Sequence, residues 1–420
     1  MYVISSQRGA KDVKYNHKDV HSVKGKEASL SPSHIPKVPL LSFFAGAGFL
    51  DIGFIQAGFD IIWRNEYNLS FVEGFEYAIS HMPNINNGGK VHNTSSITNL
   101  NADQIAREAF HGLPKPEIFG MIGGPPCPDF STGGKNLGRE GGYGKLSQVY
   151  TDLIIDLQPT FFLFENVPGL LRTRKHKQFL HELMVQLSEH YFIEFNVLNA
   201  LEYGVPQDRE RLFLVGFLKK WFIRNINLQL PIDGGNWETL LFSAKKHSSH
   251  SLLPEARWFP WPVRLYEHAK TRFNWPEQSP FGAYLEKPVG IPEELMIGSF
   301  ISNINELSML PNGLEGFSPR SSKFTSISEG DVSRKSFKRL HRWRYSPAAA
   351  YGNNEVHLHP TEPRRLTVRE ALRIQTVPDT YIFPEAMPLS YKFKMIGNGV
   401  PIKLAQEIAE SFATILRSNA

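Results

Sequence analysis

The segment Val38–Phe54 has the sequence VPLLSFFAGAGFLDIGF, and it decides the fold class of the chain. An apolar run, Val38–Phe44, ends in the glycine-rich turn Ala45–Gly48, and a second apolar stretch follows. A short buried strand that passes through glycines into a helix is typical of the first unit of a parallel α/β sheet. The turn has neither a GxGxxG nor a GKS/T pattern, so it predicts no phosphate cradle. Taken alone, it is equally typical of an ordinary strand-to-helix turn.

Four further apolar runs repeat this pattern along the chain. They are Ile61–Arg64, Ile118–Ile122, Thr160–Phe164 and Leu212–Phe217. Helical patterns separate them, for example at Asp103–His111 and Lys177–His190, and a last amphipathic helix is predicted at Ile402–Leu416. Short strands that alternate with helices predict a doubly wound, mostly parallel α/β sheet. In such a fold the chemistry lies at the carboxyl ends of the strands.

The composition is that of a globular protein. The chain has 420 residues, of which 41% are apolar and 21% are charged. At roughly 100–200 residues per domain, this length allows two to four domains. No apolar run reaches the ~18–20 residues that a membrane helix needs, and the N-terminus has no apolar core of the signal-peptide kind. We therefore expect no association with membranes.

The chain contains a single cysteine, Cys127. One cysteine forms neither an intrachain disulfide nor a multi-cysteine zinc site, so a disulfide scaffold is excluded and a reducing compartment is expected. We predict no bound metal. The formal net charge is +5, a mild basic excess whose distribution matters more than its size.

Two segments differ from the α/β pattern. Residues 1–36 are polar, contain six Lys or Arg, and are predicted to form a flexible basic tail. Residues 217–345 contain six of the seven Trp and 18 Lys or Arg against 12 Asp or Glu, without regular periodicity. We predict a catalytic domain of residues 37–216 and 388–420, and a smaller irregular domain of residues 217–387.

Polar residues follow the predicted strands. A carboxylate such as Glu66, after the second strand, can accept hydrogen bonds from ribose hydroxyls. Burial would raise the pKa of Glu165, after the fourth strand, and make it a proton donor; a helix-capping acid is the plain alternative. Cys127 lies in the Pro-flanked loop GGPPCPDFS (123–131), which can hold a thiolate at a fixed angle, although a lone cysteine is often a small buried apolar residue. The arginines of Gln207–Arg211 suit carbonyls or phosphates, or form an exposed charged turn.

In their order and spacing, these segments resemble the DNA cytosine-5 methyltransferase family. The resemblance covers almost all of residues 40–217 and 350–410. The matching motifs are FAGAGFLDIGF (44–54), Glu66, GGPPCPDFS (123–131), ENVPGL (165–170), QDRERLF (207–213), RRLTVREALRIQ (364–375) and IGNGVP (396–401). The family carries a variable target-recognition region between its QxRxR and RxLTxRE motifs, where this chain has the Trp-rich basic segment. The resemblance implies a Rossmann-like S-adenosylmethionine-dependent methyltransferase domain with a smaller irregular target-recognition domain.

The resemblance implies a role for each catalytic residue. Cys127 would attack carbon 6 of a cytosine flipped out of the duplex, and carbon 5 would then take a methyl group from S-adenosyl-L-methionine. Glu165 would protonate or hydrogen-bond ring nitrogen 3. Arg211 would hold the cytosine carbonyl, with Arg209 as a further partner. These roles fit the chemistry, because attack on an aromatic ring needs a thiolate together with a proton donor.

The resemblance also implies a pocket for S-adenosyl-L-methionine. Its expected residues are Phe44, Ala45, Gly46, Gly48, Glu66, Tyr67, Ser96, Asn398 and Val400. Glu66 would take the ribose hydroxyls, and Phe44 and Tyr67 would pack near the adenine. Ser95-Ser96-Ile97 stands where the family often has Gly-Asp-Ile, so one contact to the cofactor differs.

Double-stranded DNA is the implied partner, and phosphate neutralisation accounts for the basic surplus of the recognition region. The expected DNA contacts are Ser131, Lys135, Arg334, Lys335, Lys338, Arg339, Arg342 and Arg344. The first two belong to the glycine-rich segment Ser131–Leu146, which resembles the mobile loop of the family. The others belong to the run RKSFKRLHRWR (334–344), for which a solvated charged face is the alternative. Pro128, after the cysteine, stands where many members of the family have Gln. Tyr143 stands where an arginine is common in the mobile loop, so we expect the DNA contacts of that loop to differ.

Three alternatives remain open. A related branch methylates cytosine in transfer RNA with the same residues, and the size of the recognition region favours DNA over it. A catalytically silent DNA-binding relative conflicts with the intact Cys127, Glu165 and Arg211. A small-molecule α/β enzyme leaves the basic insert unexplained. We expect a monomeric, cytoplasmic bacterial enzyme, the modification half of a restriction–modification pair, with a cognate restriction endonuclease implied by association only.

Overall fold

In the computed structural model, the compact unit that the described residues form is Lys37–Ala420. The predicted basic tail, residues 1–36, lies outside the described residues, so all elements below belong to this unit. The described residues are 37–83, 85, 91–126, 142–226, 241, 257–301, 303–318, 321–334, 336–348, 351 and 357–417.

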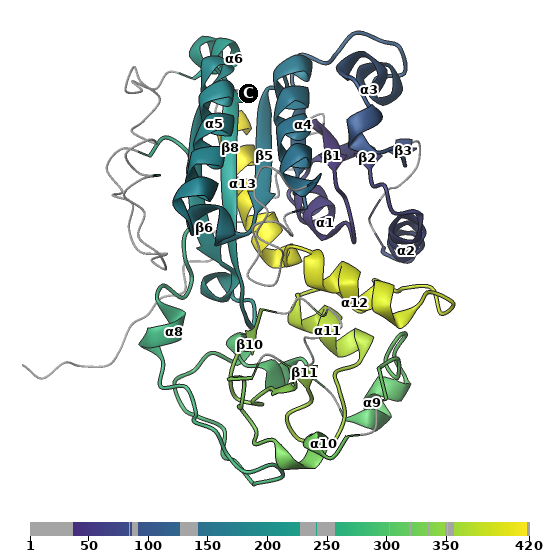
Figure 1. Ribbon diagram of the computed structural model, residues 1–420, viewed down its shortest axis with the longest axis vertical. Coiled ribbons are helices and arrows are strands. Elements are labelled where there is room, and N and C mark those ends of the chain that lie inside the picture. Colours follow the sequence, from purple (N-terminus) through teal and green to yellow (C-terminus); the bar gives the residue numbers. More distant parts are fainter. Residues whose placement is uncertain are drawn as a thin grey trace, which may run out of the picture. The chain divides into compact units, whose positions relative to one another are not determined.

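A seven-stranded sheet forms the centre of this unit. Its strands are β1 (Pro39–Phe43), β2 (Asp60–Asn65), β3 (Val91–Asn93), β4 (Gly120–Gly123), β5 (Phe161–Asn166), β6 (Tyr191–Asn199) and β8 (Glu210–Leu218). They lie in the order β3-β2-β1-β4-β5-β8-β6, and β8 runs antiparallel to both of its neighbours (Figure 1). The other paired strands are parallel. The prediction of a doubly wound, mostly parallel sheet is therefore confirmed.

The five predicted strands are all present, but the sequence patterns miss β3 and β6. β6 pairs with β8 along its whole length, from Tyr191 opposite Leu218 to Asn199 opposite Glu210. It starts directly after the helix that ends at His190, and neither Gly nor Pro separates the two. No local signal therefore marks where the helix stops and the strand begins.

Helices cover both faces of the sheet. The α-helices are α1 (Phe49–Gln56), α2 (Leu69–Ser80), α3 (Ala102–Ala109), α4 (Gly142–Leu157), α5 (Arg174–His190), α6 (Lys219–Asn225), α8 (Ala269–Arg272), α9 (Ile304–Ser308), α10 (Lys323–Ser326), α11 (Val368–Ile374), α12 (Leu389–Asn398) and α13 (Ile402–Arg417). The 3-10 helices are η1 (Ile97–Asn99), η3 (Pro168–Leu171), η4 (Ala200–Tyr203), η6 (Glu293–Leu295) and η7 (Ile297–Ser299).

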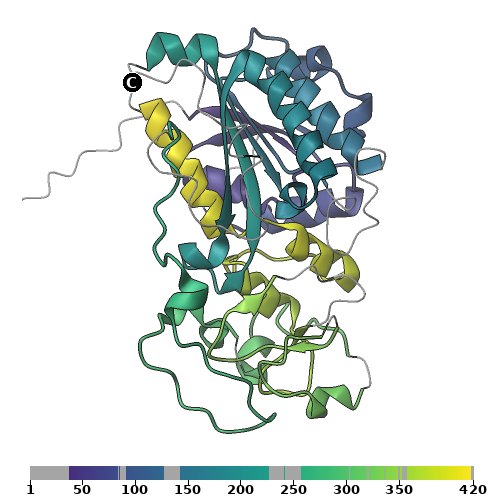
Figure 2. The same ribbon diagram turned by 60° about the vertical axis from the view of Figure 1, so that its left-hand side comes forward.

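The sheet separates two hydrophobic cores. On one face α3, α4 and α5 pack against side chains that include Leu41 and Phe162. On the other face α1 and α13 pack against the neighbouring residues Leu40 and Phe161. Figures 1 and 2 show the α4 and α5 layer and α13 on opposite sides of the sheet. This arrangement follows from the alternation of side chains along a strand, which makes continuous apolar runs suited to a sheet covered on both faces.

A further core joins the C-terminal helices to the first ones. It includes Phe49 of α1, Phe75 of α2, Leu372 of α11 and Phe393 of α12. The sequence assigns α11 to the second predicted domain, and its side chains pack with those of α1, α2 and α12. The compact unit Lys37–Ala420 is not divided further, so the boundaries of the two domains stay a prediction.

The described residues between Arg257 and Leu366 are irregular, as the weak periodicity predicts. They form short helices and the two-residue strands β9 (Lys338–Arg339), β10 (Ser346–Pro347) and β11 (His357–Leu358). β11 pairs with β9, and β10 pairs with β7 (Gln207–Asp208), which begins the QDRERLF motif. The irregular region is thereby attached to the chain immediately before β8.

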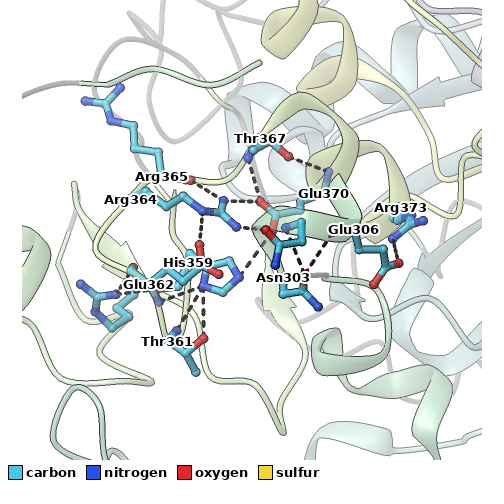
Figure 3. A network of polar contacts seen from close by, with 12 residues as sticks. Asn303, Glu306, His359, Thr361, Glu362, Arg364, Arg365, Thr367, Glu370 and Arg373 are labelled. Atoms are coloured by element: carbon cyan, nitrogen blue, oxygen red, sulfur yellow. Dashed lines mark hydrogen bonds and ion pairs between the residues drawn. The ribbon is translucent and has the colours of Figure 1, made fainter. Parts of the chain in front are cut away.

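The motif RRLTVREALRIQ forms a buried polar junction at the start of α11 (Figure 3). The carboxylate of Glu370 accepts hydrogen bonds from Arg364 at 2.7 and 2.8 Å and from the backbone N–H of Thr367 at 2.8 Å. The hydroxyl of Thr367 accepts the N–H of Glu370, which completes a capping box. These bonds fix the first turn of α11 against the irregular region.

Candidate active site

The turn after β1 has a left-handed backbone conformation at several residues, which favours glycine. Phe44, Gly46 and Gly48 all have positive φ, of 55°, 56° and 68°. A Cβ on Gly48 would lie 1.9 Å from the ring of Phe75, so only glycine fits there. A Cβ on Gly46 would meet only the Phe44 carbonyl oxygen, at 3.8 Å, so the backbone at Gly46 borders open space. This open side is suited to the close approach of a ligand.

Glu66 closes the turn from the end of β2. Its two carboxylate oxygens accept the N–H groups of Gly46 at 3.0 Å and Asn68 at 2.9 Å. Burial raises the pKa of Glu66, an effect that the two N–H groups and Lys394 partly oppose. Each oxygen has a second lone pair, so the carboxylate can still accept hydroxyl donors such as those of a ribose. The ring of the adjacent Tyr67 is 72% exposed and free to cover an aromatic ligand.

The remaining residues predicted for the cofactor differ in exposure. Ser96 is half-buried and its hydroxyl lies 2.8 Å from that of Thr98. Asn398 is exposed at the end of α12, whereas Val400 is buried in the core around α13. Next to Glu66, the sequence interpretation missed Asn65, whose amide donates to the carbonyls of Asn93 and Ser95 at 3.0 and 2.9 Å. Its position directly before Glu66 is the signal that could have identified it.

Glu165 and Arg211 form an ion pair where β5 and β8 lie side by side. Nε of Arg211 is 2.9 Å from Oε1 of Glu165, and each side chain is 12% exposed. Nη1 of Arg211 donates to the carbonyl of Glu210 at 2.8 Å, which fixes the guanidinium further. Burial raises the pKa of Glu165 despite Arg211 and Arg209, and burial also lowers the pKa of Arg211. A carboxyl with a raised pKa can donate a proton. The fixed guanidinium next to it can donate hydrogen bonds to a carbonyl at the same place.

The segment that leads to Cys127 passes directly beside Glu165. A Cβ on Gly124 would lie only 2.6 Å from Oε2 of Glu165, so glycine allows this close approach. The amide of Asn166 donates to the carbonyl of Pro125 at 3.3 Å and ties the segment to the end of β5. Gly124 and Asn166 thus serve the site although sequence reasoning assigned them no role. Cys127 itself lies outside the described residues.

Arg209 reaches the end of α12 and is also close enough to Glu165 to lower its pKa by its charge. Its Nη2 donates to the carbonyls of Gly397 at 2.7 Å and Gly399 at 2.8 Å, and the side chain is buried. These carbonyls flank Asn398, which is predicted to contact the cofactor. We therefore propose a positioning role for Arg209, while its predicted role as a further partner of the cytosine stays a prediction.

The predicted DNA contacts fall into two groups. Ser131, Lys135 and Lys335 lie outside the described residues. Among the others, Arg339 is fully buried, and its guanidinium donates to backbone carbonyls that include those of Phe324 and Ile327. Arg339 is saturated by these carbonyls, so we do not retain it as a proposed DNA contact.

Three more residues of the basic run have partners inside the protein. Arg342 pairs with the fully buried Glu329 at 2.7 Å, and Arg344 donates to the carbonyl of Pro276 at 3.1 Å. Arg334 lies 3.3 Å from Asp331, with 57% of its side chain exposed. Lys338 is half-buried. Of the described residues in this run, Arg334 is the one whose charged end is best exposed to a partner.

Two general properties of the described residues complete the picture. No group of three or more His, Cys, Asp or Glu side chains among them is arranged to hold a metal ion. Within the same residues, no helix has both the length and the apolar character needed to cross a membrane.

Comparison with known proteins identifies the family. The sequence profile of the C-5 cytosine-specific DNA methylases matches residues 38–414. The Type II methyltransferase M.NmeDI of Neisseria meningitidis serogroup C is 42% identical over 393 residues, which cover 91% of this chain and 85% of that protein. M.MthTI of Methanothermobacter thermautotrophicus, another Type II methyltransferase, is 32% identical and covers 88% of this chain and 96% of its own.

Solved structures share the fold. A prophage-encoded protein of E. coli, assigned as a DNA modification methyltransferase, has a TM-score of 0.58 at 24% identity and covers 91% of this chain and all of its own. The fold is Rossmann-like, and the family match makes the chain an S-adenosylmethionine-dependent methyltransferase. The chain belongs to the C-5 cytosine-specific DNA methylase family, and it is a DNA cytosine-5 methyltransferase.

Proposed function

We propose that this enzyme methylates carbon 5 of a cytosine flipped out of double-stranded DNA, within one short target sequence, through a covalent adduct with Cys127. The Glu165–Arg211 pair carries the proposal. It is held at 2.9 Å at the end of β5, where the segment leading to Cys127 passes close to Glu165. The flipped base is needed because a stacked ring is inaccessible, and unstacking costs a few kcal/mol.

In this mechanism the Cys127 thiolate adds to carbon 6 of the ring, and the electron pair shifts toward carbon 5. Glu165 shares its proton with ring nitrogen 3, and the burial that raises its pKa favours the protonated form that this step requires. Arg211 donates to the ring carbonyl while its Nε keeps Glu165 oriented. Once carbon 5 carries the methyl group, its proton passes to water and the C–H electron pair re-forms the double bond to carbon 6. The bond to sulfur breaks, Cys127 leaves as a thiolate, and the proton shared with nitrogen 3 returns to Glu165.

The turn after β1 fits S-adenosyl-L-methionine, because the backbone is open at Gly46 and the Glu66 carboxylate has lone pairs left for ribose hydroxyls. When bound, this cofactor supplies an electrophilic methyl group. We assign the ribose to Glu66 and the adenine to Phe44 and Tyr67. Asn398 and Val400 complete the pocket, and Arg209 holds the backbone on both sides of Asn398.

The second candidate is cytosine methylation of transfer RNA by the same residues. A Dnmt2 methyltransferase of S. pombe shares the fold with a TM-score of 0.54 at 12% identity, and this likeness concerns the fold alone. The relatives at 42% and 32% identity are named as Type II methyltransferases, which favours DNA.

We also propose that the protein acts as a cytoplasmic monomer and protects its host's DNA from a cognate restriction endonuclease.

The proposal is tested by expressing the chain in a host that lacks cytosine methylation and sequencing its genome after bisulfite treatment. We expect protected cytosines at one short motif, and none with the Cys127→Ser variant. Absence of protected DNA cytosines from a folded enzyme that binds S-adenosyl-L-methionine contradicts the DNA assignment. Bisulfite sequencing of transfer RNA from the same cells then decides the second candidate.

A further inference from the structure

Three exposed cations form a patch after the end of β5, the strand that carries Glu165. This edge patch consists of Arg172, Arg174 and Lys175, which lie between η3 and the first turn of α5 and are all exposed. The sequence has no Asp or Glu between Glu165 and Glu182, and no ion pair joins the patch to any residue that the structure describes. Its positive charge is therefore available to a partner.

The edge patch is fixed relative to Glu165. The hydroxyl of Thr173 accepts the N–H of His176 at 3.1 Å and caps α5. The ring Nδ1 of His176 lies 3.0 Å from the carbonyl oxygen of Gly169, which ties α5 back to η3. Because η3 directly follows β5, the patch lies at the carboxyl edge of the sheet, the same edge that carries Glu165 and Glu66.

The basic run 334–344 supplies less free charge than its sequence indicates. Arg339, Arg342 and Arg344 all donate to groups of the protein itself. A DNA substrate needs phosphate contacts on both sides of the target base, because such contacts set the register of the duplex. The exposed cations of the edge patch are suited to this task, because they have no ion-pair partner among the described residues and lie at the same edge of the sheet as Glu165.

We infer that the edge patch binds backbone phosphates of the DNA duplex that presents its cytosine to Glu165. The inference rests on the proposed function and extends it, because it places a DNA-binding surface on the methyltransferase side of the molecule. Arginine and lysine bind phosphate by charge-assisted hydrogen bonds and release counterions on binding, so the contact is independent of base sequence.

The test compares two double variants that each remove two positive charges. Arg174→Gln with Lys175→Gln changes the edge patch. Lys220→Gln with Arg224→Gln is the matched control on α6, which starts at the end of β8, and β8 is antiparallel to β5. The control therefore lies at the opposite edge of the sheet. Binding of a fluorescein-labelled duplex is measured by anisotropy from 50 to 200 mM salt, together with kcat and both KM values.

We expect the patch variant to bind the duplex about tenfold more weakly, with a salt slope reduced by about 1.8 for two lost phosphate contacts at about 0.9 each. Its kcat and its KM for S-adenosyl-L-methionine should stay unchanged, as should all values of the control. Equal behaviour of the two double variants overturns the inference. A wild-type enzyme that binds the duplex through the patch but protects no DNA cytosine in the bisulfite experiment supports the patch and contradicts the proposed function.

Discussion

Glu165 shows how a single side chain obtains its chemistry from its surroundings. Its carboxyl is 12% exposed at the end of an apolar strand, and desolvation outweighs the attraction of Arg211 and Arg209, so its pKa is raised. The Arg211 guanidinium is held by the carboxylate on one side and the Glu210 carbonyl on the other. The pair is thus preorganised before any substrate arrives, which is the condition for electrostatic stabilisation of a developing charge.

The substitution Glu165→Gln tests this role. Gln keeps the size of the side chain and a carbonyl oxygen for Arg211, but it has no acidic proton to share with ring nitrogen 3. We expect the single-turnover rate of methyl transfer to fall about 100-fold or more, with little change in the affinity for S-adenosyl-L-methionine. Glu117→Gln, at a side chain that is 75% exposed, serves as the control. A rate within threefold of wild type would contradict the assignment.

At the scale of elements, the junction before α11 depends on a neutral histidine. The ring Nδ1 of His359 accepts the N–H groups of Thr361 at 3.2 Å and Glu362 at 3.0 Å, and its Nε2 lies 3.4 Å from Glu370 (Figure 3). Burial, reinforced by nearby arginines, lowers the pKa of His359 to about 3. The folded protein therefore keeps this ring uncharged throughout the range in which the unfolded chain binds a proton.

This histidine predicts a loss of stability in acid. The pKa of His359 is about 3 in the folded protein and about 6.5 in the unfolded chain. The stability that the neutral ring gives the folded protein is therefore complete above pH 6.5 and is lost as the pH falls toward 3. The slope is about 1.4 kcal/mol per pH unit. Urea midpoints between pH 7 and pH 5 should fall less steeply in a His359→Asn variant, whose amide oxygen can replace Nδ1 as acceptor. An unchanged slope would show that other groups account for the effect.

At the scale of the whole molecule, Arg209 connects segments that are far apart in sequence. It precedes β8, and it donates to two carbonyls at the end of α12, 188 and 190 residues further along the chain. The predicted cofactor residue Asn398 lies between these carbonyls. One buried side chain next to β8 therefore holds the backbone on both sides of the predicted cofactor residue.

We predict that Arg209→Lys weakens binding of S-adenosyl-L-methionine. A single ammonium group cannot reproduce the fixed geometry with which one guanidinium nitrogen serves both carbonyls. Calorimetry should show about tenfold weaker affinity, while kcat at saturating cofactor stays within about threefold of wild type. Arg417→Lys, at an exposed position of α13, is the control. A lowered kcat with unchanged affinity would instead place Arg209 in the reacting centre.

Local patterns predict the parts of this protein whose signals are local. The sequence predicts β1 and its turn, because glycine is required at Gly48, where the Phe75 ring excludes any side chain. It also predicts the carboxylates at the strand ends, because parallel strands place their carboxyl ends at one edge. It does not predict β6, because this strand follows a helix without a break and is defined by its pairing with β8.

The α/β class, the order of the motifs and the positions of Glu66 and Glu165 follow from the amino-acid sequence, because strand ends and glycine turns depend on neighbouring residues. The use of the arginines depends on the packing of the whole chain. Arg339 is buried among carbonyls, Arg209 holds the end of α12, and the edge patch stays exposed. A cation's partners come from distant segments, so its charge can be assigned to DNA or to the protein's interior only once those segments are packed together.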